Sequence, residues 1–177
     1  MVRIMCISII CIFSCSTGHF NEYGIYVPNK PRYTLKSRIN FDHPKGLDTV
    51  NLYQYHGYFD SMKNIFINEE EISKGWSIYD KYCSNGRVYS FGTDNLNENS
   101  LNPNYGSKGY YIYDKKRNEI KYEVFTNGNG GQYVILTCRL SENGDSLCIF
   151  ENRKSRSYQV YIKKIIPKEW NKYKIDW

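Results

Sequence analysis

The chain has 177 residues and a formal net charge of +6, with 24 Lys and Arg against 18 Asp and Glu. A chain of this length can form one domain with a sizeable core and needs no disulfide or metal for stability. It has 18 tyrosines and lacks alanine altogether. This composition removes the best helix former and enriches a residue that suits a half-buried sheet. A mainly helical fold is therefore not expected.

The first fifteen residues have the pattern of an export signal. Met1-Val2-Arg3 is a short positive segment, residues 4–13 are an apolar run, and the small residue Ser14 comes directly before Cys15. The apolar run is too short to remain as a transmembrane helix. An ordinary secretory signal, or a misplaced start codon followed by a buried strand, is the alternative.

Ile12-Phe13-Ser14-Cys15 resembles the lipobox of bacterial lipoproteins, in which the chain is cut before the cysteine and the thiol carries the lipid. The resemblance implies a signal peptide at 1–14 and a lipidated tether at 15–22 with Cys15 as the lipid carrier. The remaining residues, 23–177, are expected to form a single β-barrel domain. The resemblance also implies a protein held by its lipid in the bacterial cell envelope. Ser16 and Thr17, with no run of acids, resemble the start of lipoproteins that face the periplasm from the outer membrane.

Three thiols then remain in the mature chain, at Cys83, Cys138 and Cys148. Cys138 and Cys148 flank the turn at 142–144 and are the candidate disulfide pair. A three-residue loop with Gly144 in the left-handed conformation would set them directly opposite each other. A two-residue turn at 143–144 would place them one step out of register, on opposite faces of the sheet.

The first half of the chain predicts short strands separated by loops. Strands are expected at 23–27, which Pro28 ends, at 33–39 and at 50–59. Residues 68–75 carry a cap residue, early acids, a late base and a terminal glycine, which favours one or two helical turns. A hairpin is expected from 76–83 and 87–91. The stretch 93–107 has no periodicity and is predicted to be a mobile or functional loop.

The second half alternates more regularly. Apolar and polar residues alternate from Glu119 to Phe125, which predicts one inward set and one set in water: Ile120, Tyr122 and Val124 against Glu119, Lys121 and Glu123. Strands are also expected at 133–140 and 158–163. The Gly- and Asn-rich segments 127–131 and 142–145 between them favour hairpin turns.

At the carboxyl end, Pro167 fits the first position of a short helix, and Trp170, Tyr173 and Trp177 recur at spacings of three and four. We expect this aromatic stripe to pack against the β-structure. About nine or ten strands result. The predicted fold is all-β, a small antiparallel up-and-down barrel with a short C-terminal helix; a two-sheet sandwich is the alternative.

The segment GYYIYDKKRNEIKYEVFTNGNGGQYVILTCRLSENGDSL, followed by IPKEW, resembles uncharacterised lipoproteins of Bacteroidetes-type bacteria that are described as lipocalin-like. The resemblance implies an up-and-down barrel and an envelope location. It also draws attention to Asp-Ser/Thr-apolar triplets, which are similar to O-glycosylation acceptors of such bacteria. The candidates are Thr49, Ser61 and Ser146, with chance matches as the alternative.

No catalytic motif stands out, and neither a metal nor a cofactor is expected. His19, His43 and His56 are far apart, and no Cys-x-x-Cys, phosphate loop or Gly-x-Ser-x-Gly elbow occurs. The scattered basic residues are interpreted as solvated faces, so no nucleic-acid partner is expected.

Two hypotheses of function remain. In the first, the barrel binds a small apolar or amphipathic ligand in its mouth or interior. In the second, the core is filled by residues such as Tyr122, Leu136 and Val160, and the protein touches another envelope component through exposed tyrosines and the loop at 93–107. The size of the side chains in the interior distinguishes the two.

Overall fold

A computed structural model describes residues 18–39, 42–69, 75–126 and 131–177. In these ranges the chain is all-β, and the helical elements with described bounds are short 3₁₀ turns. The strands are β1 (Gly18–Phe20), β2 (Tyr26–Pro28), β3 (Leu52–Asp60), β4 (Ile65–Asn68), β5 (Ser77–Tyr82), β6 (Arg87–Thr93), β7 (Ser107–Asp114), β8 (Glu119–Thr126), β9 (Gln132–Leu140), β10 (Ser146–Phe150) and β11 (Tyr158–Lys164). The 3₁₀ turns are η1 (Lys36–Arg38), η2 (Glu98–Leu101), η3 (Pro103–Tyr105) and η5 (Lys168–Trp170).

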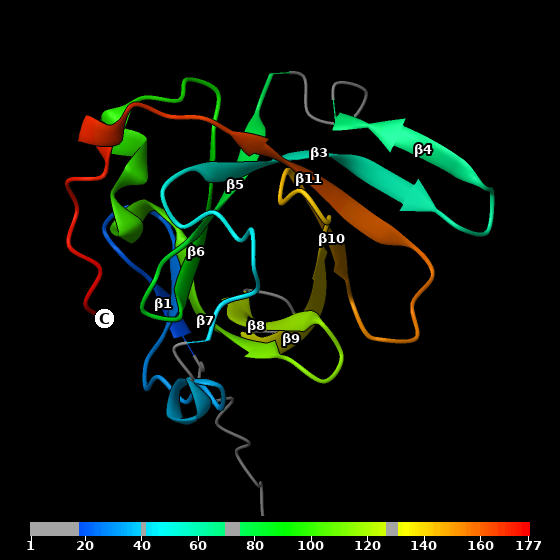
Figure 1. Cartoon of the computed structure of the whole chain (residues 1–177). Helices are drawn as coiled ribbons and strands as arrows, with labels where there is room; N and C mark the ends of the chain where they lie inside the picture. Colours follow the sequence, from blue (N-terminus) through cyan, green and yellow to red (C-terminus); the bar gives the residue numbers. More distant parts are fainter. Residues whose placement is uncertain (1–17, 40–41, 70–74, 127–130) are drawn as a thin grey trace, which may run out of the picture.

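Eight strands close into an antiparallel barrel in the order β3-β5-β6-β7-β8-β9-β10-β11, because β11 pairs with β3 (Figure 1). Apart from β4, each strand pairs with the next one in the sequence, so the barrel has the predicted up-and-down topology. The alternative of two separate sheets is not what the chain adopts. The short strand β4 lies outside the ring and pairs with the far end of β3.

Strand β3 is shared between two neighbours on one side. Its first half pairs with β5 at Tyr53 and Gln54, and its second half pairs with β4 from Gly57 onward. On the other side the register with β11 skips His56, which makes a β-bulge there. Bulges bend a strand and increase its twist. Beyond the bulge β3 stays paired with β11, and β4 takes the place of β5 on its other side.

The barrel interior is filled by side chains from all eight strands. Tyr82 of β5 stands at its centre, with ring centroids 5.9 Å from Tyr53, 5.2 Å from Tyr111 and 6.3 Å from Tyr122. Its hydroxyl donates to the Cys138 sulfur at 3.8 Å. A ring that reaches from β5 to β8 and β9 spans the barrel, so the interior is a packed core.

The outer face of the barrel is covered by both ends of the described chain. The segment 31–39, which we call the strap, places the buried Leu35 against Tyr110 and Ile112 of β7. Residues 166–177, which we call the tail, pack Ile166, Trp170, Tyr173, Ile175 and Trp177 against β5, β6 and Leu101. The predicted packing of the aromatic stripe is therefore confirmed, although only the single turn η5 is helical.

Several local expectations need correction. Residues 33–39, predicted as a strand, form the 3₁₀ turn η1, and Gly18–Phe20, placed in the tether, is a strand paired with Tyr26–Pro28. The loop at 93–107 contains the turns η2 and η3 and buries Leu101. Most of the predicted helical turn at 68–75 lies outside the described residues. In the described part of the chain, no helix has the length and apolarity to span a bilayer.

Candidate functional site

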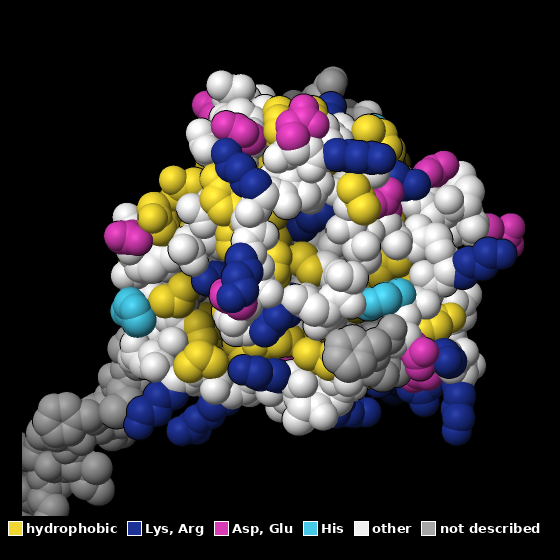
Figure 2. All heavy atoms as spheres, turned by 60° about the vertical axis from the view of Figure 1, so that its left-hand side comes forward, with side chains coloured by type: hydrophobic (Ala, Val, Ile, Leu, Met, Phe, Trp, Pro, Cys, Tyr) yellow, Lys and Arg dark blue, Asp and Glu magenta, His cyan; other side chains and the backbone are white. Residues whose placement is uncertain are grey.

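The strongest candidate site is a hollow of about 390 Å³ outside the barrel, which we call the hairpin groove. It lies between the β1–β2 hairpin, the strap, strands β7 and β8, and Trp177 at the end of the tail. Six aromatic residues line it: Tyr23, Tyr26, Tyr33, Tyr110, Phe125 and Trp177. Lys36, Lys108 and Glu22 are its charged lining residues. Figure 2 shows the side of the molecule that carries the hairpin and the tail, where hydrophobic side chains form a band among Lys and Arg side chains.

The hairpin forms one wall of the groove because a local turn closes it. Asn21 begins the turn, and its side-chain oxygen accepts the N–H groups of Tyr23 (3.0 Å) and Ile25 (2.9 Å). Its amide donates to the carbonyl oxygen of Asn104 at 3.0 Å, next to β7. Tyr26 stacks on Phe125 of β8, with ring centroids 5.5 Å apart and planes at 10°. The hairpin is thus fixed to the barrel at two points.

The strap forms the second wall, and one buried carboxylate holds it. Glu123 of β8 points outward but is only 1% exposed. Its Oε1 accepts the N–H of Thr34 at 3.0 Å and the Thr34 hydroxyl at 3.1 Å, and its Oε2 accepts the N–H of Leu35 at 2.7 Å. Hydrogen bonds to a charged acceptor are among the stronger ones, and three of them fix the strap over the wall.

Tyr110 and Trp177 meet at one end of the groove. The Tyr110 hydroxyl donates to the main-chain oxygen of Trp177 at 3.1 Å, and Arg87 Nε donates to the same oxygen at 3.0 Å. The Lys36 ammonium lies 5.7 Å from the centre of the Tyr110 ring, and the Lys108 ammonium lies 5.1 Å from the centre of the Trp177 ring. Two cations therefore stand over two aromatic rings of the groove.

Comparison with protein-family models, curated proteins and solved structures finds no match for this chain. The candidate site is therefore defined by the geometry of the described residues.

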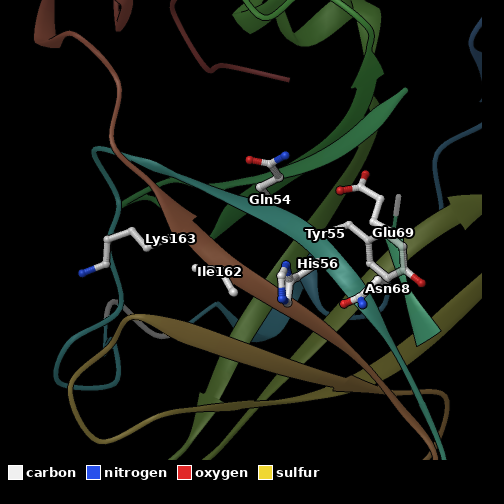
Figure 3. A pocket seen from close by; sticks show the side chains of 7 residues that line it. All are labelled: Gln54, Tyr55, His56, Asn68, Glu69, Ile162 and Lys163. Carbon is white, nitrogen blue, oxygen red and sulfur yellow. The ribbon is translucent and has the colours of Figure 1, made fainter. Parts of the chain in front are cut away.

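A second hollow, of about 360 Å³, lies at the place where β3 parts from β5 (Figure 3). Its lining is mostly polar: Gln54, Tyr55, His56, Asn68, Glu69, Ile162 and Lys163. Figure 3 shows Glu69 and Asn68 beside Tyr55, whereas Lys163 extends away from them on the far side of β11. The Lys163 ammonium forms an ion pair with the Asp145 carboxylate at 2.8 Å. This cleft offers polar groups but little apolar surface for a ligand.

A third hollow, of about 220 Å³, borders Lys81 and Cys83 under the tail. Burial lowers the pKa of Lys81 to about 8 and raises the pKa of the Cys83 thiol to about 11. A reactive cysteine needs a lowered pKa, so the raised pKa of Cys83 makes it an unreactive thiol. The Lys81 ammonium donates to the carbonyl oxygens of Thr49 (2.8 Å) and Val50 (2.6 Å) and so joins the start of β3 to β5.

Inside the barrel, Asp80 is a buried carboxyl among tyrosines. Neither of its oxygens has a hydrogen-bond partner in the described part of the chain. Burial raises its pKa to about 7, and the neighbouring Ser90 hydroxyl acts in the opposite direction. No group of three or more His, Cys, Asp or Glu residues with metal-site geometry occurs among the described residues.

The structure also places the residues predicted as modification sites. Cys15 lies outside the described residues, so its lipidation stays a prediction. Thr49 precedes β3, Ser61 lies in the β3–β4 turn with its hydroxyl 2.9 Å from that of Ser157, and Ser146 begins β10. All three are half-buried and the fold does not bring them together. Their glycosylation likewise stays a prediction.

The candidate disulfide is absent, and the strand register explains why. Cys138 pairs with Ile149 and Cys148 pairs with Arg139, so the two thiols are one step out of register. This is the register expected for the shorter turn, and both cysteines are free. Cys138 points into the core and is 0% exposed, whereas Cys148 is half-buried on the other face.

Proposed function

We propose that this chain is a lipid-anchored binding protein of a bacterial cell envelope, whose ligand is a small amphipathic molecule held in the hairpin groove. The observation that carries the proposal is the contrast between a barrel interior packed with tyrosines and an open, aromatic groove on its outside. In this account the barrel is a rigid scaffold, and the hairpin, the strap and the tail build the site on it.

The lining of the groove supports an amphipathic ligand. Tyrosine and tryptophan present large apolar faces together with a polar atom, and such side chains dominate many small-molecule sites. A volume of about 390 Å³ lies within the usual range of about 300–1,000 Å³ for ligand sites. The anchor is supported by the export pattern that ends at Cys15, and the proposal gives the protein no catalytic role.

Native mass spectrometry of the chain, purified gently from a cell that lipidates it, tests this function. We expect the wild-type chain to retain a covalent lipid mass after denaturation, which the Cys15→Ser variant lacks. Both chains should also carry an additional mass that is lost on denaturation, because the groove does not depend on the anchor. The double variant Tyr26→Ala/Tyr33→Ala should lose this second mass.

Two results would contradict the proposal. A chain with no lipid on Cys15 would remove the anchor. A non-covalent mass that persists in the Tyr26→Ala/Tyr33→Ala variant would place the ligand elsewhere in the molecule. A Met62→Ser variant is the matched control, since Met62 is 95% exposed at the far end of the β3–β4 hairpin and does not line the groove.

A second candidate function is that of an interaction protein whose partner is another envelope component. The observation that favours it is the β3–β4 hairpin. Strand β4 is the end strand of the sheet, and Met62, Ile65 and Phe66 on this hairpin are exposed. End strands and exposed apolar side chains both favour pairing with another chain. A photo-crosslinking amino acid at position 62 should capture one partner in intact cells if this function holds, and none if it does not.

A further inference from the structure

We propose that the hairpin groove selects an anion: a small molecule with an apolar body and one carboxylate or phosphate group, which the ammonium groups of Lys36 and Lys108 hold. This inference rests on the proposed function, since it names the chemical class of the ligand for the same groove. Neither lysine belongs to a motif in the sequence, and only the fold brings them together.

Lys36 and Lys108 both line the groove, and each ammonium group lies over an aromatic ring. Lys36 lies over the Tyr110 ring and Lys108 over the Trp177 ring. Trp177 packs against the cluster that contains Tyr110, and the Tyr110 hydroxyl donates to the main-chain oxygen of Trp177 at 3.1 Å. The strap and strand β7 thus each place a positive charge over an aromatic ring of the groove.

Both charges are available to a ligand. Neither Lys36 nor Lys108 forms an ion pair within the described ranges of the chain, whereas Lys115, Lys163 and Lys172 each lie within 3.0 Å of a carboxylate oxygen. The Lys108 ammonium donates one of its three hydrogen bonds to the side-chain oxygen of Asn104, at 2.7 Å. Partial burial lowers the pKa of Lys108, while the charge of nearby Asp176 acts in the opposite direction without forming an ion pair. A bound anion would further stabilise the charged form of Lys108.

The remainder of the groove suits an apolar body. Tyr26 and Phe125 stack, and Tyr33 meets Tyr110 edge to face with ring centroids 4.9 Å apart. The Tyr33 hydroxyl donates to the carbonyl oxygen of Lys108 at 2.8 Å, so this ring turns its polar atom to the backbone. Glu22 is the one acid that lines the groove, on the hairpin, which disfavours a second anionic group there.

Isothermal titration with probes that share a ten-carbon chain tests the inference. The probes are decanoate, decyl phosphate, decanol and decyltrimethylammonium, each below its micelle concentration, together with inorganic phosphate alone. We expect both anionic probes to bind at least about tenfold more tightly than decanol, because hydrogen bonds to a charged group are worth more than neutral ones. The cationic probe and inorganic phosphate should bind more weakly than either.

Lys36→Met/Lys108→Met is the decisive variant, and Lys45→Met/Lys154→Met is its control. Both pairs lower the net charge equally, and Lys45 and Lys154 are exposed residues that do not line the groove. The groove variant should lose about tenfold or more in affinity for the anionic probes and keep its affinity for decanol, whereas the control should bind all probes as the wild type does.

The outcomes separate the two proposals. Equal binding of decanol and decanoate, unchanged in the lysine variant, would contradict the claim that the groove selects an anion. The groove would then be a site for neutral amphipathic molecules. If inorganic phosphate bound as tightly as decyl phosphate, the claim that the ligand has an apolar body would be wrong. Failure of every probe to bind the wild-type chain would contradict the proposed function itself. The comparison among probes uses the wild-type chain, so it stands even if a variant folds poorly.

Discussion

At the scale of single residues, the most unusual feature is a carboxyl group that is buried among tyrosines inside the barrel. Asp80 faces inward beside Tyr82 because the alternation along β5 is fixed by its pairing with β3 and β6. Removing a carboxylate from water disfavours its charged form, and the pKa of Asp80 accordingly rises from 3.8 to about 7.

This shift predicts that the protein loses stability as the pH rises from about 4 to about 7. In that window the folded chain keeps a proton on Asp80 that the unfolded chain has released, so raising the pH favours unfolding. With a raised pKa of about 7, the loss is on the order of 4 kcal/mol, at about 1.4 kcal/mol per pKa unit. Asp80→Asn should abolish this part of the pH dependence and be more stable than the wild type at pH 8.

Urea unfolding of the wild type and of Asp80→Asn at pH 4 and pH 8 measures this effect. Asp94→Asn is the control, because Asp94 is exposed and should leave the difference between the two pH values unchanged. If the Asp80→Asn and wild-type free energies of unfolding differ by the same amount at both pH values, then Asp80 is ionised in the folded protein and the account of its burial is wrong.

The alternation from Glu119 to Phe125 shows what single residues reveal in advance. Its inward set was predicted correctly, since Ile120, Tyr122 and Val124 belong to the core. Its outward set was expected in water, yet Glu119 and Glu123 are buried. The sequence period identifies the two faces of a strand, but it does not reveal that other segments cover the outer face, here the strap over Glu123.

At the scale of elements, Glu123 attaches the strap to β8 by three hydrogen bonds. Glu123→Ala removes three hydrogen bonds and should cost about 2–3 kcal/mol of stability. Since the strap then loses its attachment to β8, trypsin should cleave after Arg32 and Lys36 faster than in the wild type. Glu142→Ala, in an exposed turn, is the matched control and should not change the cleavage. Unchanged cleavage in Glu123→Ala would mean that Leu35 and Tyr33 hold the strap without it.

Two glycine turns offer a matched pair at the same scale. Gly24 (φ +75°) and Gly144 (φ +76°) have the same left-handed conformation, but a Cβ on Gly144 would collide with the main-chain oxygen of Gly46, whereas nothing lies within 4 Å of a Cβ on Gly24. Gly24→Ala should cost about 1 kcal/mol, from the backbone conformation alone.

Gly144→Ala should lower the free energy of unfolding by about 3 kcal/mol, because the turn at Gly46 and the turn at Gly144 must also move apart. Thermal and urea unfolding of the two variants side by side measures the difference. Equal losses would show that the contact between the two turns relaxes without cost.

Elements with strong local patterns were predicted, and elements defined by distant contacts were not. The hairpin at 77–93 and the strands at 119–126 and 132–140 follow their turn residues and their period of two. Residues 33–39 alternate in the same way but form η1, because Glu123 accepts the N–H groups of Thr34 and Leu35 that a strand would use in its ladder. In 158–164, Val160 was expected in the core, but Tyr161 faces the core and Val160 is half-buried on the other face.

The hairpin groove could not be predicted from the sequence for a related reason. Its residues come from Tyr26, the strap, strand β7 and Trp177, which are separated by up to about 150 positions and share no motif. The many tyrosines were a signal that pointed to aromatic surfaces, but it did not show which of them would line a hollow and which, like Tyr82, would fill the core.

At the scale of the whole molecule, the closed barrel accounts for the division between scaffold and site. Closure through β3 and β11 leaves an interior just wide enough for side chains in a barrel of eight strands. Tyrosines fill that space, so the ligand site that we propose lies outside the barrel. The two ends of the described chain supply it, because the hairpin and strap approach the outer face of β7 and β8 from one side and the tail from the other (Figure 1).

The central claim, a filled barrel with its ligand outside, is tested most directly by a titration of the ¹⁵N-labelled chain with decanoate, followed by NMR. We predict shifts in the amide signals of the hairpin, the strap and residues 104–110, and in the indole signal of Trp177. The amides beside Tyr82, Tyr122 and Cys138 in the interior should stay where they are. Shifts concentrated on the interior strand positions, with the groove unchanged, would contradict the account and place the ligand inside the barrel.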